Sequence, residues 1–379
     1  MIDRFKYILS LIRNGPSFMG DFNELLMDRY LGHHKVIGWH EGSPVYSSFL
    51  IPGMSKPHAN SLVQRFMSHL KNEPLPAMVN ISVTDTCNAK CEHCSFFGAM
   101  NQPGRKVLST NEMKDVIKNC QDFGLSIINF VGGEPLIRKD LPDLIQYIDK
   151  NRSVSSVFTN GWYLPERAYE LKKAGTMLVN VSLDSTEPSV HDSFRRLPGL
   201  FEKAIEGIRT SRKHKLLTGI STTVTQQDLE QGNLERMIRL AHNEGVNELF
   251  VFDMMPVGMY SHRDDLKATP PERKLMYQII DDHNKKKDLP GIFCYTRFKD
   301  PSIMGCSAGR NYFYITPYGD VCPCDFTAKP VGNLTQTPIY NLWSKLVNQR
   351  RHCGFVNDLC NLDTRTEMTP LQKNKPNQI

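Results

Sequence analysis

The sequence predicts an α/β fold built on a largely parallel sheet, and two observations support that prediction. From residue 78 onward, short runs rich in Val, Ile, Phe or Thr alternate with runs of helical length. This alternation is typical of βαβ units, whose strands lie parallel. Several helical runs also open with start signals, such as Ser109-Thr110 ahead of Glu112 and Pro270-Pro271 at a first turn.

The predicted elements follow one another in a regular order along the chain. Strands are expected at 78–85, 126–132, 153–159, 177–184, 217–225 and 247–253. Helices are expected between and after them, at 111–123, 140–150, 165–174, 201–213, 233–244 and 271–287. In barrels built from such units, the loops at the carboxyl ends of the strands form the active site.

Residues 1–77 are predicted to form a separate α/β extension. Apolar residues recur there at helical spacing, which describes an amphipathic helix: Ile2, Phe5, Ile8, Leu9 and Ile12. We expect this face to pack on the protein itself or on a second subunit, and peripheral membrane contact is the less favoured alternative. A hairpin is expected within 36–50, a helix over 58–70, and a polar tail over 366–379.

Composition excludes several classes of protein. The chain has 379 residues, of which 40% are hydrophobic and 23% charged, so it can bury a large core. No apolar run approaches the roughly 18 residues of a membrane span, and the N-terminus lacks the cleavage site of a secretory signal. We therefore expect a cytoplasmic protein whose ten cysteines are reduced. The net charge of +6 is spread along the chain, so no nucleic-acid partner is expected.

Cys87, Cys91 and Cys94 directly follow the first predicted strand and are the most informative residues of the chain. Zinc sites usually combine two Cys-x-x-Cys pairs or a mixed shell of Cys and His. An iron–sulfur cube held by three cysteines instead leaves one iron open for another ligand. The spacing favours such a reactive cluster, with a zinc or structural site as the alternative.

This spacing resembles that of the radical S-adenosylmethionine (SAM) superfamily. The run Phe130-Val-Gly-Gly-Glu-Pro-Leu136 resembles the Gly-Gly-Glu-Pro motif of the same family. The resemblance implies a partial (β/α)6 TIM-like barrel. It also implies that Cys87, Cys91 and Cys94 hold a 4Fe-4S cluster whose open iron binds SAM, giving a 5′-deoxyadenosyl radical on reduction.

The resemblance assigns further residues to SAM. His93 is expected near the adenine, and the amino group of the methionine is expected at Gly132, Gly133, Glu134 and Pro135. Ser182 and Asp184, in a Val-Ser-Leu-Asp run, are candidates for the hydroxyls or the methionyl part. Arg195 is expected to pair with the methionyl carboxylate, with a surface cation as the alternative. Asn160 and Thr223, at the ends of two strands, are candidates for the same ligand.

The remaining cysteines predict a second site. Cys306, Gly319 and Cys324 resemble the opening of a SPASM/Twitch extension, and Cys353 and Cys360 can complete a four-thiolate shell. Cys322 is a fifth candidate ligand. We expect one auxiliary 4Fe-4S cluster, in a domain over 291–365 that follows a barrel over 78–290.

Two cysteines are not expected to bind a cluster. Cys120 is predicted to be a buried helix residue. Cys294 is expected to pack in the core, with a donor role near the active site as the alternative.

The leading functional prediction is a radical SAM oxidoreductase that acts on a peptide or protein, with the auxiliary cluster assisting electron transfer. The alternative is an enzyme of small-molecule biosynthesis, whose substrate is a tetrapyrrole, lipid, nucleoside or sugar. A non-catalytic cluster protein is the least favoured class. A flavodoxin- or ferredoxin-type protein is the expected electron donor.

Overall fold

The computed structural model describes residues 33, 35–71, 75–96, 102–255, 260, 263–266, 268–299, 306–327 and 329–352. These residues form a ten-stranded sheet with helices around it, and a separate two-stranded hairpin. The N-terminal amphipathic helix, Cys353, Cys360 and the polar tail, all predicted above, lie outside the described residues.

Seven strands that follow one another along the chain form most of the parallel part of the sheet, and each is hydrogen-bonded to the next. They are β3 (Met78–Ser82), β4 (Ile127–Val131), β5 (Val154–Thr159), β6 (Leu178–Ser182), β7 (Leu217–Val224), β8 (Glu248–Asp253) and β9 (Gly291–Cys294). The first six confirm the predicted strands, and β9 was not predicted. The strand expected over 78–85 ends at Ser82, because the next residues turn to pair with the loop after β4.

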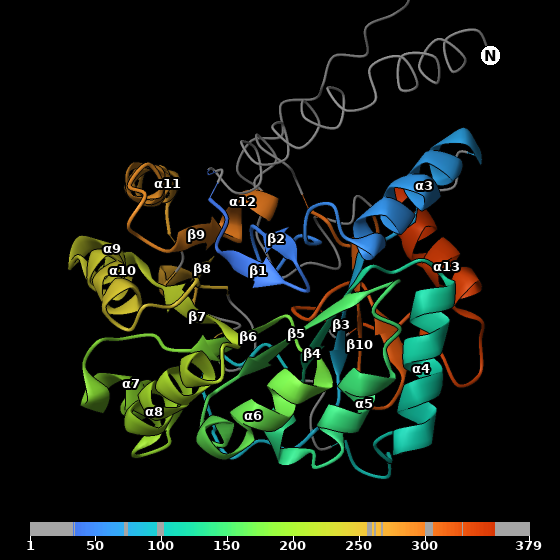
Figure 1. Ribbon diagram of the computed structural model, residues 1–379, viewed down its shortest axis with the longest axis horizontal. Helices are drawn as coiled ribbons and strands as arrows, with labels where there is room; N and C mark the ends of the chain where they lie inside the picture. The colour runs from blue at the N-terminus through green and yellow to red at the C-terminus, as the bar shows by residue number, and fades with distance from the viewer. Residues whose placement is uncertain are drawn as a thin grey trace, which may run out of the picture.

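Helices lie in an arc outside the strands (Figure 1). They are α4 (Thr110–Asp122), α5 (Leu141–Tyr147), α6 (Leu164–Ala174), α8 (Leu200–Lys213), α10 (Asn233–Asn243) and α11 (Pro270–Asn284). The predicted start of α4 is a capping box: the Ser109 amide donates to Glu112 Oε2 at 2.8 Å, and the Glu112 amide donates back to Ser109 Oγ at 3.4 Å. Strands and helices therefore confirm the predicted α/β barrel.

Short elements occupy the loops at the carboxyl ends of the strands. They are η3 (Pro135–Ile137) after β4, α7 (Pro188–Arg195) after β6, and α9 (Gln226–Glu230) after β7. A further turn, η5 (Asp264–Leu266), follows β8, and α12 (Thr296–Lys299) follows β9. Of these, α7 matters most for the site because it carries both His191 and Arg195.

The C-terminal region extends the same sheet. Strand β10 (Tyr312–Ile315) pairs parallel with β3, and β11 (Asp320–Cys322) and β12 (Gly332–Asn333) follow it antiparallel. Gly319 lies at the β10–β11 turn with a φ of 87°, a conformation that favours glycine. Helix α13 (Ile339–His352) covers this end, and its Trp343 ring packs against Phe313 and Phe123.

The segment before β3 closes the opposite end of the barrel. Strands β1 (Gly38–His40) and β2 (Ser43–Val45) form a hairpin, and α3 (Lys56–Lys71) follows. Side chains hold the hairpin at the amino ends of the later strands, because Asn247 donates to the Ile37 carbonyl at 2.6 Å. Lys35 likewise donates to the Leu289 carbonyl at 3.2 Å.

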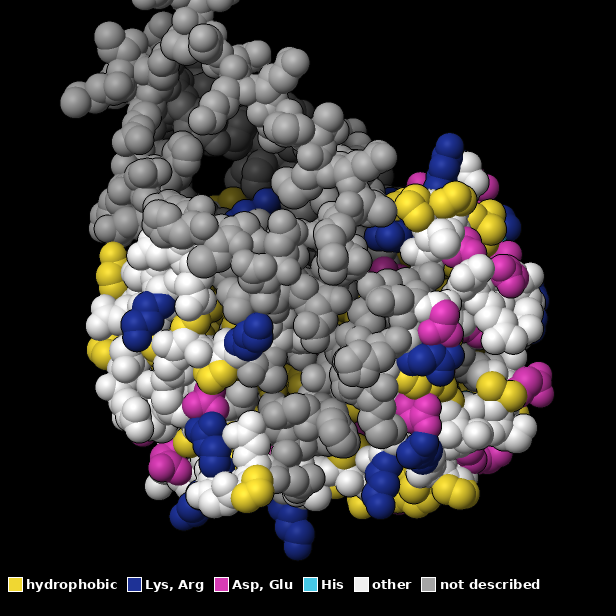
Figure 2. Space-filling view, turned by 180° about the vertical axis from the view of Figure 1, so that it is seen from behind, with side chains coloured by type: hydrophobic (Ala, Val, Ile, Leu, Met, Phe, Trp, Pro, Cys, Tyr) yellow, Lys and Arg dark blue, Asp and Glu magenta, His cyan; other side chains and the backbone are white. Residues whose placement is uncertain are grey.

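The described face seen in Figure 2 shows no strong separation of charge. Figure 2 shows Lys and Arg side chains scattered among Asp and Glu over the visible described face. No helix in the described part of the chain is long and apolar enough to cross a membrane.

Cys120 is buried in α4 with 0% of its surface exposed, which confirms its predicted position. We expect Cys120→Ala to lower the free energy of unfolding by about 1 kcal/mol, because it removes one buried sulfur. Cys120→Ser should cost more, since a buried hydroxyl then lacks a partner. Both variants should retain full iron content after anaerobic reconstitution. Loss of iron in either, measured beside denaturant unfolding, would contradict a purely structural role.

Candidate active site

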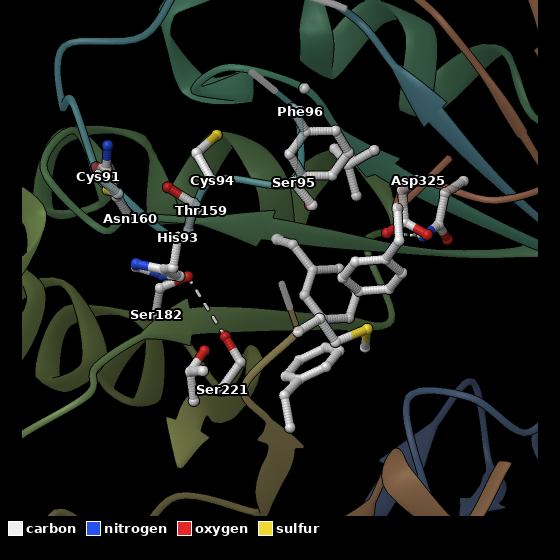
Figure 3. A pocket seen from close by; sticks show the side chains of 18 of the residues that line it. Cys91, His93, Cys94, Ser95, Phe96, Thr159, Asn160, Ser182, Ser221 and Asp325 are labelled. Carbon is white, nitrogen blue, oxygen red and sulfur yellow. Dashed lines mark hydrogen bonds between the residues drawn. The ribbon is translucent and has the colours of Figure 1, made fainter. Parts of the chain in front are cut away.

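A cavity of about 190 Å³ lies at the carboxyl ends of the parallel strands. Most of the residues predicted to bind the cluster or SAM line it: Cys87, Cys91, His93, Cys94, Gly132, Gly133, Glu134, Asn160, Ser182, Arg195 and Thr223. Pro135 and Asp184 do not line it. Figure 3 shows Cys91, His93 and Cys94 on one side of the cavity, and Phe96 and Asp325 on the other.

The three cysteines sit on one partly buried loop after β3. The Ala89 amide donates to Cys87 Sγ at 3.4 Å, and Cys91 Sγ lies 3.7 Å from the Arg195 carbonyl. Burial raises the pKa of the Cys87 thiol to about 12, so binding iron must release a proton from it. The described residues include no group of three ligands arranged around a single ion. Three thiols facing one cavity do fit a cluster, because each of them ligates a different iron.

Gly133 and Glu134 of the Gly-Gly-Glu-Pro motif support the cysteine loop. The Gly133 amide donates to the Thr84 carbonyl at 3.0 Å, and the Glu134 amide donates to the Thr86 carbonyl at 2.8 Å. A Cβ on Gly133 would lie 2.1 Å from the Thr86 oxygen, closer than any side chain tolerates. Glycine is therefore required there so that the loop after β4 can approach the loop after β3.

The Glu134 carboxylate joins the ends of β4 and β5. It accepts hydrogen bonds from the Leu136 amide at 3.0 Å, the Thr159 hydroxyl at 2.6 Å and the Asn160 amide at 2.7 Å. Burial raises the pKa of Glu134 to about 7, although these hydrogen bonds act in the opposite direction. The Asn160 side chain in turn donates to Asn88 at 2.8 Å, within the cysteine loop. The predicted contact of Glu134 with the methionyl amine stays a prediction.

Asp184 and Arg195 form a buried ion pair beside the cavity. Arg195 Nε donates to Asp184 Oδ2 at 2.7 Å, and the Thr223 amide donates to Asp184 Oδ1 at 3.1 Å. Burial opposes ionisation of Asp184, but Arg195 and the nearby His93 and His191 outweigh it and lower the pKa of Asp184 to about 2. Arg195 also lines the cavity, so its guanidinium can reach the predicted carboxylate there.

His93 is held in place by an aromatic ring that sequence reasoning missed. Its ring stacks on Phe194 of α7 with centroids 4.3 Å apart and an interplanar angle of 13°. Burial lowers the pKa of His93 to about 4, so the ring is neutral at physiological pH. Ser182, another predicted residue, accepts a hydrogen bond from Ser221 at 3.3 Å (Figure 3).

The auxiliary cysteines lie in the C-terminal extension of the sheet. Cys306 is half-buried, whereas Cys322 and Cys324 are buried. Cys322 packs with Val131 and Tyr314, and burial raises the pKa of its thiol to about 12. Cys294 is buried in β9 and does not line the cavity, in keeping with the expected core position.

The other half of the cavity is aromatic, and the sequence did not predict it. Aromatic residues from well-separated segments line it: Phe49, Phe96, Phe158, Phe252, Tyr295, Tyr312 and Phe326. Polar groups interrupt this wall: the Tyr312 hydroxyl donates to Asp325 and accepts from Asn80 at 3.2 Å, and Asp253 also lines the cavity. In sequence, these residues belong to no motif that distinguishes them from ordinary core residues.

Comparison with known proteins decides the family. Residues 81–241 match the family model described as the radical SAM superfamily, and residues 306–363 match a SPASM iron-sulfur cluster-binding domain. The chain belongs to the radical SAM superfamily. Its cofactors are accordingly SAM and a 4Fe-4S cluster, with auxiliary iron–sulfur binding in the SPASM region.

Two relatives of this radical SAM enzyme are named as synthases of tetrapyrroles. An AdoMet-dependent heme synthase of Methanosarcina barkeri is 28% identical over 71% of this chain and 82% of its own length. An Fe-coproporphyrin III synthase of the same organism is 29% identical over 56% of this chain and 52% of its own length. The leading prediction of a peptide or protein substrate is therefore wrong, and the small-molecule alternative fits better.

Two solved structures share the fold of this chain. Streptococcus suis SuiB bound to its precursor peptide SuiA has a TM-score of 0.62 and 15% identity, over 82% of this chain and 75% of its own. The anSMEcpe enzyme with bound AdoMet has a TM-score of 0.56 and 18% identity, over 73% and 79% of the two chains. At this identity the likeness concerns the fold alone.

We expect Gly133→Ala to reduce the iron bound after anaerobic reconstitution and to weaken SAM binding, because the added Cβ must displace the cysteine loop. Gly104→Ala is the matched control. Gly104 has a φ of 75°, so alanine is strained there, but no atom lies within 4 Å of the added Cβ. Equal iron content in the two variants would show that the Gly133 contact does not shape the cluster site.

We expect Asp184→Asn to lower the free energy of unfolding at pH 7 by about 3–5 kcal/mol, because Arg195 is left buried without its counter-charge. The folded-state pKa of Asp184, about 2, lies below its usual 3.8. The advantage of the wild type should therefore be complete above pH 3.8 and decline as the pH falls toward 2. Asp265→Asn, which removes an exposed partner of Arg263, should cause no measurable change in denaturant unfolding.

Proposed function

We propose that this chain is a radical SAM oxidoreductase of tetrapyrrole biosynthesis that removes hydrogen from a porphyrin-type substrate. The observation that carries the proposal is the match to an AdoMet-dependent heme synthase, which spans 71% of this chain and 82% of that relative.

Cys87, Cys91 and Cys94 would hold the cluster, and the glycine motif, Asn160 and Arg195 surround the place for SAM. When bound, this cofactor supplies a 5′-deoxyadenosyl radical, which can remove hydrogen from an unactivated carbon. The chain's own residues bind SAM and the substrate, orient them, and exclude water. Arg195 would pair through its guanidinium with a carboxylate, and neutral His93 presents a flat, buried ring to an aromatic base.

The aromatic half of the cavity supports a flat, conjugated substrate. Phe158, Phe252 and Tyr295 come from three different segments and all border the space beside the cysteines. Aromatic rings bind planar conjugated molecules through large contact areas and offset stacking. Because the cavity is lined mainly by apolar side chains on this side, water is excluded from the region where a reactive radical must survive.

Tyr312 and Asp325 form a hydrogen-bonded polar pair in this otherwise mainly apolar wall. Burial and the nearby Asp325 raise the pKa of Tyr312 well above its usual value. Its hydroxyl therefore stays protonated at neutral pH and donates to Asp325. The pair can orient a polar substituent of the substrate against the cavity wall without introducing a mobile charge.

Reduction of the cluster requires an external electron, and we assign this role to a flavodoxin- or ferredoxin-type donor in the cytoplasm. The auxiliary cluster would assist electron transfer, since three of its candidate ligands lie on the sheet extension that borders the same cavity: Cys306, Cys322 and Cys324.

The test measures 5′-deoxyadenosine formed by the anaerobically reconstituted, dithionite-reduced enzyme. Fe-coproporphyrin III should raise its formation several-fold above the rate with SAM alone and should itself be converted to a product of different mass. GTP is the matched comparison, because a GTP 3′,8-cyclase of Petrotoga mobilis is 30% identical over 48% of this chain. Stimulation by GTP and not by the iron porphyrin would overturn the proposal, and Cys94→Ala should abolish formation with either compound.

A further inference from the structure

Phe49 reaches the cavity from the segment that precedes the barrel. Among the described residues that line the cavity, it is the only one that comes before β3 in the chain. The side chain is 7% exposed, so nearly all of it is packed against other residues. The N-terminal extension therefore contributes directly to the cavity, although its sequence contains no motif that indicates such a role.

Glu248 fixes the backbone that carries Phe49. This carboxylate is fully buried at the first residue of β8, accepts a hydrogen bond from the Ser47 hydroxyl, and accepts another from the Ser48 amide at 3.1 Å. The Phe49 amide then donates to Ser47 Oγ at 3.2 Å. Three successive residues are thus tied to the amino end of one barrel strand.

Aromatic contacts fix the ring itself. Phe49 stacks on Phe293 with centroids 5.4 Å apart and an interplanar angle of 19°, and its centroid lies 4.7 Å from that of Phe250. Neither Phe250 nor Phe293 lines the cavity. Phe49 also meets Phe158, which does line it, edge to face at 6.1 Å. The Phe49 ring therefore lies between the packed interior of the barrel and the cavity.

Phe49 and the cysteines approach the cavity from opposite directions. The amino ends of parallel strands lie along one edge of a barrel and the carboxyl ends along the other. Glu248 belongs to the first edge, whereas the cysteine loop follows β3 at the second. A molecule bound beside the cluster and SAM would consequently meet Phe49 as the floor on which it rests.

We infer that Phe49 is the floor of the substrate site and determines which ring substituents of a tetrapyrrole fit beneath the cluster. This inference rests on the proposed function and names the residue that sets its selectivity. Glu248 acts as a positioning residue for the ring. Removing the ring deepens the site, whereas a larger ring makes it shallower, and the two changes must alter selectivity in opposite directions.

The test uses two probes, iron mesoporphyrin and iron deuteroporphyrin, which differ only by two ethyl groups in place of hydrogens. Binding to the reconstituted enzyme is followed by the change in the porphyrin absorption band. Phe49→Ala should shift the ratio of the two dissociation constants toward the ethyl-bearing porphyrin by about tenfold, since one or two carbons in an apolar pocket change selectivity by that order. Phe49→Trp should shift the ratio the other way, and both variants should bind SAM as the wild type does.

Phe313 provides the control, because it is buried, packs on Trp343 and does not line the cavity. Phe313→Ala should leave the ratio unchanged. If either alanine variant fails to fold, Phe49→Leu and Phe313→Leu give the same comparison. Glu248→Gln, which turns an amide toward two donors, should shift the ratio in the direction of Phe49→Ala; a lowered melting temperature with an unchanged ratio would refute its positioning role.

The outcomes separate the two proposals. If the wild type binds both iron porphyrins and the Phe49 variants keep its ratio, the floor assignment is wrong and the proposed function stands. If the wild type binds neither porphyrin nor Fe-coproporphyrin III, the tetrapyrrole function fails and the substrate class named for this floor fails with it.

Discussion

The candidate site depends on two backbone hydrogen bonds between the loops that follow β3 and β4. The amides of Gly133 and Glu134 donate to the carbonyls of Thr84 and Thr86, which lie three residues and one residue before the first cysteine. Such an approach leaves no room for a side chain at Gly133. Backbone N–H groups of the loop after β4 therefore position the cysteine loop. The two loops approach so closely that only glycine fits at position 133.

Charge reinforces this arrangement from the other side of the loop. Arg195 binds Asp184 through its Nε, and its own carbonyl lies beside Cys91 and accepts a hydrogen bond from the Lys90 amide at 3.3 Å. One residue of α7 thus links the end of β6 to the cysteine loop by both its side chain and its backbone. Because Asp184 and Arg195 are both buried, loss of either would leave an uncompensated charge close to the cluster.

The sequence allowed the barrel and most of the cofactor half of the cavity to be predicted, because both rest on local patterns. Strands of Val and Ile alternate with capped helices, and Cys87, Cys91, Cys94 and the glycine motif stand at fixed spacing at strand ends. Phe49, Phe194 and Tyr312 could not be found in this way. They reach the site through long-range packing, and a phenylalanine that lines a cavity has the same local pattern as one in the core.

The pairing of β10 with β3 makes the barrel depend on the C-terminal region. Strand β3 is flanked by β4 on one side and β10 on the other, so the strand that leads into the cysteine loop is an interior strand only while the C-terminal region is present. Without β10, its N–H and C=O groups would form a free sheet edge, which is a template for aggregation. The auxiliary-cluster region is therefore no detachable module: it is the lateral boundary of the barrel.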